Sequence, residues 1–168
     1  MLKDKEINKK AIAAASFLLY NSPQKITAEN LVVYLYAADR LSVSKTGMPI
    51  TWDTYRIRNG KLEMAADLDV KALLSFSDSE FKALYEHCKY NHLSECSVEC
   101  LTEVSNLSEL DMSFGELKVG LSDIRKQTEI RPQDMVQFFD LSDKAKKDLI
   151  DHLNSVDRID RIFQAIER

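Results

Sequence analysis

Apolar positions recur along most of the chain at spacings of three and four residues, the periodicity of an amphipathic helix. The first run predicts a helix from about Lys5 to Tyr20, which stops before Pro23 because the proline ring disfavours helix in the residue ahead of it. The next run, from about Ala28 to Ser44, is apolar on nearly every side and predicts a central helix buried on several faces. Thr27 is expected to cap its start, and Gly47 to end it.

The segment from Ile50 to Arg58 has a different character. Its threonines and aromatic residues have strand propensity, and Asn59-Gly60 is a strong signal for a two-residue hairpin turn. We therefore expect a β-hairpin near residues 50–65. The stretch that begins at Leu62 could instead start a helix, and the sequence leaves that choice open.

Helix-start signals punctuate the rest of the chain. A serine followed three residues later by glutamate, a capping box, occurs at Ser77 and Ser113 and predicts helices ending near Tyr90 and Lys126. Further helix starts are expected at Ser94, Pro132 and Ser142. These signals predict a mainly α fold, in which a compact helical domain with a small β-hairpin (residues 1–110) carries a C-terminal helical extension packed on it (residues 111–168).

The last segment carries a narrow apolar stripe from Val156 to Ile166, which includes Ile159 and Phe163 and has charged residues on its opposite face. Docking on the chain's own core is the default interpretation. A partner-facing helix is the second, because such a stripe can also fill a groove or pair with another helix.

Composition and charge agree with a helical, cytoplasmic protein. The chain of 168 residues has four Gly and three Pro, fewer than an all-β fold usually needs. Its formal net charge is −4, with 23 basic and 27 acidic residues intermixed, so nucleic acid is not the expected partner. Three cysteines without framework spacing suit a reducing cytoplasm.

The apolar run from Ala11 to Tyr20 imitates a secretory signal. Asp4 and Glu6 stand where a signal needs a basic region, and the run is too short to span a bilayer. A first core helix is therefore the favoured interpretation, and no membrane partner is expected.

The sharpest cluster of candidate chemistry is a row of zinc-type ligands: His87, Cys88, His92, Cys96 and Cys100. On one helix, the residues from Cys88 to Cys100 span about 18 Å, too far for one ion, although a break near residues 91–94 could fold the two halves together. Buried free cysteine behaves as a small hydrophobe, and we expect no metal site. The chain also lacks Gly-x-Ser-x-Gly and clustered glycines, so we predict no catalytic residues and no cofactor, and the chain is not expected to be an enzyme.

The segment Thr51–Arg56 is the strongest candidate for protein binding. It holds the single Trp with Tyr and Arg close by, the three residue types enriched at binding hot spots. Trp52 and Tyr55 could instead close the core beside the central helix, which is the favoured interpretation for Trp52. A contact role for Asp53 and Arg56, on the alternate face, stays open.

Two runs, Leu35–Arg40 (LYAADR) and Lys45–Tyr55 (KTGMPITWDTY), resemble the Panacea-domain antitoxin family. That family typically shows a leucine- and tyrosine-rich helix, a Gly-x-Pro-Ile-Thr turn and an aromatic strand. Leu74–Ser77, Asn91–Ser94 and Leu101-Thr102 look like the family's later helix, break and helix. The resemblance covers about residues 10 to 110. One departure is Asn59-Gly60-Lys61-Leu62, which stands where members usually have Asn/Tyr-Gly-Pro-Val and so puts the role of this loop in doubt.

The resemblance implies an antitoxin that neutralises a cognate toxin by direct protein–protein binding. Related proteins look like adaptors that hand a toxin to a ClpXP-type protease, and many such genes travel on prophages. We expect the hairpin segment and the C-terminal apolar stripe to bind the partner. The expected partner-binding residues are Trp52, Asp53, Tyr55, Arg56, Asn59, Gly60, Ile159 and Phe163. A homo-oligomer stays open, and the rival functions are a nucleic-acid-binding transcriptional regulator and a Cys/His metal-site protein.

Overall fold

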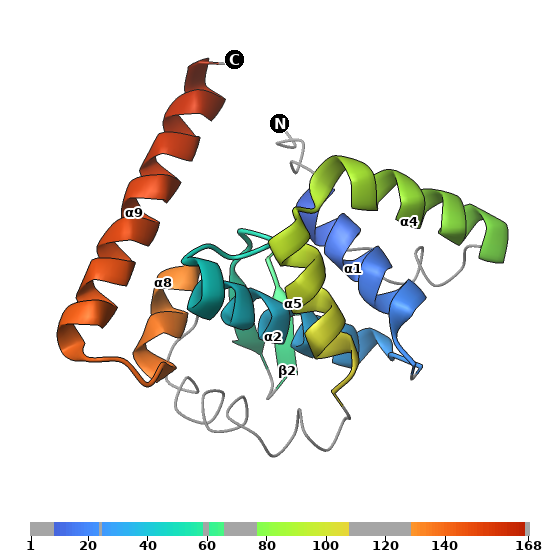
Figure 1. Cartoon of the computed structure of the whole chain (residues 1–168), viewed down its shortest axis with the longest axis horizontal. Coiled ribbons are helices and arrows are strands. Elements are labelled where there is room, and N and C mark those ends of the chain that lie inside the picture. The colour runs from blue at the N-terminus through green and yellow to red at the C-terminus, as the bar shows by residue number, and fades with distance from the viewer. Residues whose placement is uncertain (1–8, 24, 59–60, 66–76, 108–128, 167–168) are drawn as a thin grey trace.

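The computed structural model describes residues 9–23, 25–58, 61–65, 77–107 and 129–166 of the chain. Figure 1 shows helices gathered around α2, with the long helix α9 at one side. The elements are α1 (Lys9–Asn21), α2 (Ala28–Thr46), β1 (Tyr55–Arg58), β2 (Lys61–Met64), α4 (Asp78–His92), α5 (Glu95–Ser105), α8 (Pro132–Met135), the 3-10 helix η1 (Val136–Phe138) and α9 (Asp143–Ile166). This mainly α arrangement with one small antiparallel hairpin confirms the predicted fold class.

Helix α2 begins and ends where its capping residues predict. The Thr27 hydroxyl oxygen accepts a hydrogen bond of 3.3 Å from the backbone N–H of Asn30. Gly47 follows the last helical residue with a φ of 76°, and its N–H donates to the carbonyl of Val43 at 3.0 Å. A left-handed backbone at this position is what glycine adopts without steric cost, so the helix stops at Thr46.

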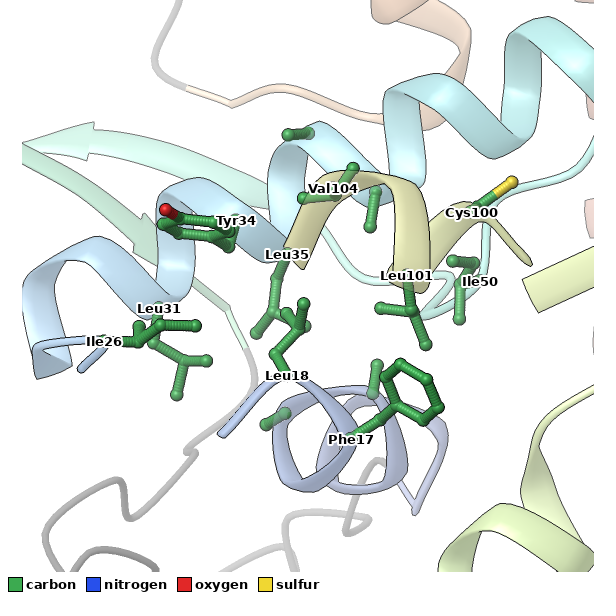
Figure 2. Close-up of a cluster of buried hydrophobic side chains, with 14 of the residues drawn as sticks. Phe17, Leu18, Ile26, Leu31, Tyr34, Leu35, Ile50, Cys100, Leu101 and Val104 are labelled. Carbon is green, nitrogen blue, oxygen red and sulfur yellow. The ribbon is translucent and has the colours of Figure 1, made fainter. Parts of the chain in front are cut away.

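The prediction that this helix is central is also confirmed, because it contributes to each of three buried clusters. The largest lies between α1, α2 and α5, where Leu18, Leu35 and Leu101 converge (Figure 2). Tyr36 belongs to a second cluster, which reaches the hairpin and Ile130. A third cluster joins Val43, near the end of α2, to Val136 and Leu153. The C-terminal segment is thus packed against α2 through the second and third clusters.

Alanines explain how closely α1 approaches its neighbours. Ala11, Ala13, Ala14 and Ala15 are fully buried, and α1 packs mainly against α4, with further contacts to α2 and α5. A side chain of one carbon lets two helix backbones come near each other, so this short helix serves as a packing surface for three others.

The predicted hairpin is confirmed, and the alternative helix start at Leu62 is wrong. Strands β1 and β2 pair antiparallel, with Tyr55 opposite Met64 and Arg58 opposite Lys61. The predicted turn residues, 59 and 60, lie between these strands and outside the described residues. Tyr55 also exchanges backbone hydrogen bonds of 2.9 and 2.7 Å with Ile130, which brings the C-terminal part of the chain to the hairpin.

The serine caps of the two helices that follow are confirmed. The Ser77 side chain accepts from the Glu80 N–H at 3.3 Å, and the Glu80 carboxylate accepts from the Ser77 N–H at 3.0 Å. Ser94 accepts from the Ser97 N–H at 3.1 Å. The break between α4 and α5 is shorter than predicted, because α4 continues to His92. The helix predicted from Ser113 lies outside the described residues.

The C-terminal segment differs from the prediction in two respects. The helix expected to start at Pro132 is only the single turn α8 followed by the tighter turn η1. The stretch capped at Ser142 and the apolar stripe beyond it form one continuous helix, α9, whose start is capped by the Ser142 hydroxyl at 3.2 Å from the Ala145 N–H. None of the helices in the described part of the chain combines the length and the apolar composition needed to cross a bilayer.

Candidate protein-docking surface

A buried carboxylate holds the loop between α2 and the hairpin in place. Asp39, midway along α2, is 1% exposed. One of its oxygens accepts from the backbone N–H groups of Ile50 and Thr51, at 2.8 and 2.9 Å. The other oxygen accepts from the hydroxyls of Thr51 and Tyr55, at 2.5 and 2.6 Å. The four hydrogen bonds fix the two ends of the segment Ile50–Tyr55 to one point on the central helix.

Burial dominates the electrostatics of this network. Desolvation raises the pKa of the Asp39 carboxyl, and the hydrogen bonds from Thr51, Tyr55 and Ile50 oppose that rise. The pKa of Tyr55 lies well above its ordinary value, first because the side chain is fully buried and then because Asp39 is close. Neither group has exposed surface through which it could meet a substrate, so the network has a structural role.

The loop that this network holds contains a strained residue. Trp52 has a φ of 55°, a left-handed conformation that is uncommon for a bulky side chain. Its indole is partly buried and packs against the cluster of Val43, Val136 and Leu153. Such a conformation costs on the order of 1–3 kcal/mol and persists where the surroundings over-determine it. Here the Asp39 hydrogen bonds on one side and the indole packing on the other supply that constraint.

The backbone after Trp52 is held by a second, smaller set of hydrogen bonds. The Thr51 hydroxyl oxygen accepts from the Asp53 N–H at 3.2 Å, and the Asp53 carboxylate accepts from the Thr54 N–H at 2.8 Å. Asp53 is 8% exposed. These short-range contacts shape the turn that leads from the loop into β1, so the direction of the strand depends on them.

Arg40, the neighbour of Asp39 in the sequence, ties α2 to the C-terminal segment. It is 7% exposed, and its guanidinium carbon lies 5.6 Å from the ring centre of Phe138 and 6.0 Å from that of Phe139. Its Nη2 donates to the Phe138 carbonyl at 3.5 Å. The guanidinium group is attracted electrostatically to the negative face of an aromatic ring. This contact therefore stabilises the packing of α2 against residues that are distant in the sequence.

Outward from the loop, the hairpin presents a charged surface, which we call the hairpin face: Arg56, Arg58, Glu63 and Glu129. Arg56 and Arg58 alternate with Tyr55 and Ile57 along β1, and their side chains are 46% and 67% exposed. Arg56 lies 3.4 Å from a carboxylate oxygen of Glu129, and Arg58 lies 3.9 Å from one of Glu63. Exposed ion pairs of this kind add little stability, so these arginines are open to a partner.

The structure separates the residues predicted to contact a partner. Tyr55 is fully buried and Asp53 nearly so, which gives them positioning roles and no contact surface in this conformation. Trp52 lies partly in the core, in line with the interpretation favoured for it from the sequence, while Arg56 is exposed. Residues 59 and 60, and the side chain of residue 163, lie outside what the structure describes.

Ile159 is 53% exposed on α9, together with Ile162 and Ile166 at 52% and 73%. We call these three residues the isoleucine stripe. The C-terminal half of α9 rises away from the rest of the chain, whereas the hairpin lies beside α2 (Figure 1). The hairpin and the stripe are therefore two separate surfaces of the chain.

The Cys/His row does not converge in the described residues. Cys96 is exposed and Cys100 is buried, and burial raises the pKa of the Cys100 thiol. The rings of His87 and His92 lie 6.3 Å apart, centre to centre. In the part of the chain that the structure describes, no three His, Cys, Asp or Glu side chains are grouped so that they could hold a metal ion. The side chain of Cys88 lies outside that part.

The sequence reasoning did not assign the Asp39 network. Its signal is an Asp-Arg pair inside a helix that is otherwise apolar on nearly every side. A charged residue on a buried helix needs partners, and the nearby threonine and tyrosine of the following segment are suitable donors. Comparison of the chain with protein-family models, with curated proteins and with solved structures found no match.

Proposed function

We propose that this chain is an antitoxin that neutralises a cognate toxin by direct protein–protein binding, with the hairpin face as the docking surface. The observation that carries the proposal is the strained Trp52, held between the Asp39 network and a core cluster directly before the strand that bears Arg56 and Arg58. Strained backbone is concentrated at functional sites, where it fixes a surface in one conformation.

The sequence resemblance supports the same segment. The two runs that resemble Panacea-domain antitoxins, residues 35–40 and 45–55, contain Asp39 and its hydrogen-bond donors Ile50, Thr51 and Tyr55. The resemblance therefore falls on the residues that build the loop and aim β1. A surface fixed before binding loses less conformational entropy when the partner arrives, which favours tight association.

The chemistry of the hairpin face suits protein recognition. Arginine is enriched at binding hot spots because its guanidinium can form several hydrogen bonds and also stack on aromatic rings. Arg56 and Arg58 project from one strand, each with a carboxylate that orients it. A toxin surface with acidic or aromatic groups would complement such a face. Delivery of the bound toxin to a ClpXP-type protease is compatible with this arrangement, because an adaptor needs a docking surface and no catalytic group.

The test is co-expression of the tagged chain with the adjacent open reading frame, scored for a stable complex and for rescue of growth. We expect both with the wild-type chain. The double variant Arg56→Glu/Arg58→Glu should lose complex and rescue while keeping its thermal stability, because the two ion pairs are exposed. The matched control is Lys144→Glu/Lys147→Glu, which makes the same charge change on exposed positions of α9.

The two variants separate the parts of the proposal. If the wild-type chain gave no complex and no rescue of growth, the antitoxin function itself would be contradicted. A complex that forms equally well with Arg56→Glu/Arg58→Glu would keep the function but reject the hairpin face as its surface. Loss of binding in the control would show a general electrostatic effect in place of a specific surface.

A further inference from the structure

The strained residue of the loop, Trp52, depends on two parts of the chain for its conformation. On one side, the Asp39 carboxylate accepts hydrogen bonds from the backbone N–H and the hydroxyl of the neighbouring Thr51. On the other side, the indole packs against the cluster that contains Leu153. The first support belongs to the central helix α2, whereas part of the second is supplied by α9, the last described helix of the chain.

A small apolar contact holds α9 on the body. Its first half contributes Leu149, Ile150 and Leu153 to that cluster, and of these three Leu153 alone is fully buried. The exposed Lys146 adds a hydrogen bond of 3.0 Å to the Gln137 carbonyl, and the C-terminal half of α9 extends away from the other helices (Figure 1). A contact of this size can open while the rest of the fold stays intact, because a local opening costs less free energy than global unfolding.

The hairpin is held by the same C-terminal segment that carries α9. Ile130 exchanges two backbone hydrogen bonds with Tyr55, and Glu129 forms an ion pair with Arg56. Trp52 lies shortly before Tyr55 in the sequence, so a change in its backbone conformation alters the path of the chain into β1. The position of the hairpin therefore depends on the contacts that hold Trp52.

Two arrangements of the loop follow from the strain at Trp52. When α9 is docked, the packing of the indole holds the residue at a φ of 55°. When α9 leaves the body, the indole loses the part of the cluster that α9 supplies, and Trp52 can return to the negative φ that a bulky residue prefers. Packed clusters switch between discrete arrangements and do not deform continuously, so the position of α9 selects one state of the loop.

We propose that α9 is a strap that controls the hairpin: its docking beside Trp52 fixes the hairpin face in one conformation, and its release loosens that face. Coupling between two sites is reciprocal, so binding at the hairpin face also strengthens the docking of α9. This coupling is a property of the free chain and does not rest on the antitoxin function. If the hairpin face binds a toxin, the docking of α9 sets the affinity of that binding.

The experiment is amide hydrogen exchange of the full chain, measured residue by residue by NMR under native conditions. The reporters are the amides of Tyr55 and Ala65, which donate to the carbonyls of Ile130 and Thr54. Leu153→Ala weakens the docking of α9 and should make both amides exchange roughly tenfold faster, the order of magnitude of a typical coupling between sites. The control on the same helix is replacement of the exposed Ile159 by alanine, which should leave both exchange rates unchanged.

A second control separates this coupling from a general loss of stability. The amide of Leu35, in the middle of α2, reports unfolding of the whole domain. Leu101→Ala, in the cluster between α1, α2 and α5, should speed exchange of Leu35 at least as much as exchange in the hairpin. Leu153→Ala should instead speed exchange in the hairpin more than exchange of Leu35.

Reciprocity gives a test from the opposite direction. Tyr55→Phe removes the hydrogen bond from this hydroxyl to Asp39 and so loosens the hairpin without touching α9. The amide of Leu153 should then exchange several-fold faster, and by a larger factor than that of Leu35. The matched control is Tyr34→Phe, which removes a buried tyrosine's hydrogen bond to the Leu107 carbonyl and should leave exchange at Leu153 in step with the whole domain.

Two results would overturn the proposal. One is exchange of the Tyr55 and Ala65 amides that Leu153→Ala leaves unchanged or raises only in step with that of Leu35. The other is exchange of the Leu153 amide that Tyr55→Phe raises no more than Tyr34→Phe does. If Leu153→Ala fails to fold, Leu149→Ala weakens the same contact at a half-buried position and is judged by the same criteria.

Discussion

Replacing Asp39 by asparagine tests whether the buried carboxylate holds the loop before the hairpin. Asparagine has nearly the same shape, and its one oxygen can still accept from the backbone N–H groups of Ile50 and Thr51. Its NH₂ group, however, faces the hydroxyls of Thr51 and Tyr55, which now donate to a carboxylate oxygen. The substitution therefore removes two charge-assisted hydrogen bonds without opening a cavity.

The expected loss of stability follows from those two bonds. A hydrogen bond to a charged group contributes about 1.5–3 kcal/mol, which gives a gross loss of about 3–6 kcal/mol. Part of this loss of stability is offset because burying a neutral amide costs less than burying a charge. We therefore expect a net loss of about 2–4 kcal/mol. A kilocalorie lowers the Tm of a protein of this size by about 2–4 °C, so the Tm should fall by roughly 5–15 °C.

Circular dichroism on heating measures the Tm, and the fluorescence of the single tryptophan reports the loop in the native state. The matched control is Asp151→Asn, the same change at an exposed position of α9, which should leave both unchanged. A Tm for Asp39→Asn within about 2 °C of the wild type, with unaltered fluorescence, would refute the reasoning that these bonds hold the loop.

The pH dependence gives an independent check of the same carboxylate. Because burial raises the pKa of Asp39, the folded chain keeps the proton on this carboxyl group at pH values where the unfolded chain has released it. Stability from this group is thus fully present below about pH 4 and is lost as pH rises through the raised pKa. Asparagine does not titrate. The difference in the free energy of unfolding between the wild type and Asp39→Asn, measured with urea, should therefore shrink from about pH 4 to 7. An advantage that grows with pH would contradict the raised pKa.

Two further predictions concern buried tyrosines and the helix stop. Tyr36 and Tyr55 are both fully buried, and their rings meet edge to face with centres 5.3 Å apart. The Tyr55 hydroxyl donates a hydrogen bond to Asp39, whereas the Tyr36 hydroxyl has no hydrogen-bond partner among the described residues. In urea unfolding, Tyr36→Phe should therefore stabilise the chain by about 1 kcal/mol and Tyr55→Phe should destabilise it by about 1–3 kcal/mol; equal effects would contradict this reading. Gly47→Ala should cost about 1–2 kcal/mol because the φ is 76°, whereas the new Cβ would make only ordinary contact, 3.4 Å from the His152 ring. Gly47→Asn, which tolerates that conformation better, should lose less of the Tm, and the reverse order would refute the explanation.

Much of the fold could be predicted from local signals in the sequence. The caps at Thr27, Gly47, Ser77 and Ser94 lie where the residue types place them, because each satisfies backbone groups within a few residues of itself. The burial of α2 followed from a helix that is apolar on nearly every side. The hairpin followed from strand propensity on both sides of a turn signal.

The candidate site could be predicted only in part. The segment from Thr51 to Arg56 was singled out by its residue types, but alternation along the strand did not tell which of its side chains are buried. Tyr55 is buried because α2 offers it both Asp39 and the ring of Tyr36, and Ile130 pairs with its backbone. These contacts join residues far apart in the sequence, and a local pattern carries no record of them.

The sequence by itself determined where this chain forms its N-terminal helices and its one described hairpin, because propensity, capping and apolar periodicity act over a few residues. Tertiary structure decided which apolar positions are covered. Leu153 and Ile162 belong to the same helix and have the same kind of side chain, yet one is fully buried and the other is 52% exposed. The difference arises because Val43 and Val136 pack against the side of α9 that carries Leu153. The C-terminal half of α9, which carries Ile162, extends away from the other helices.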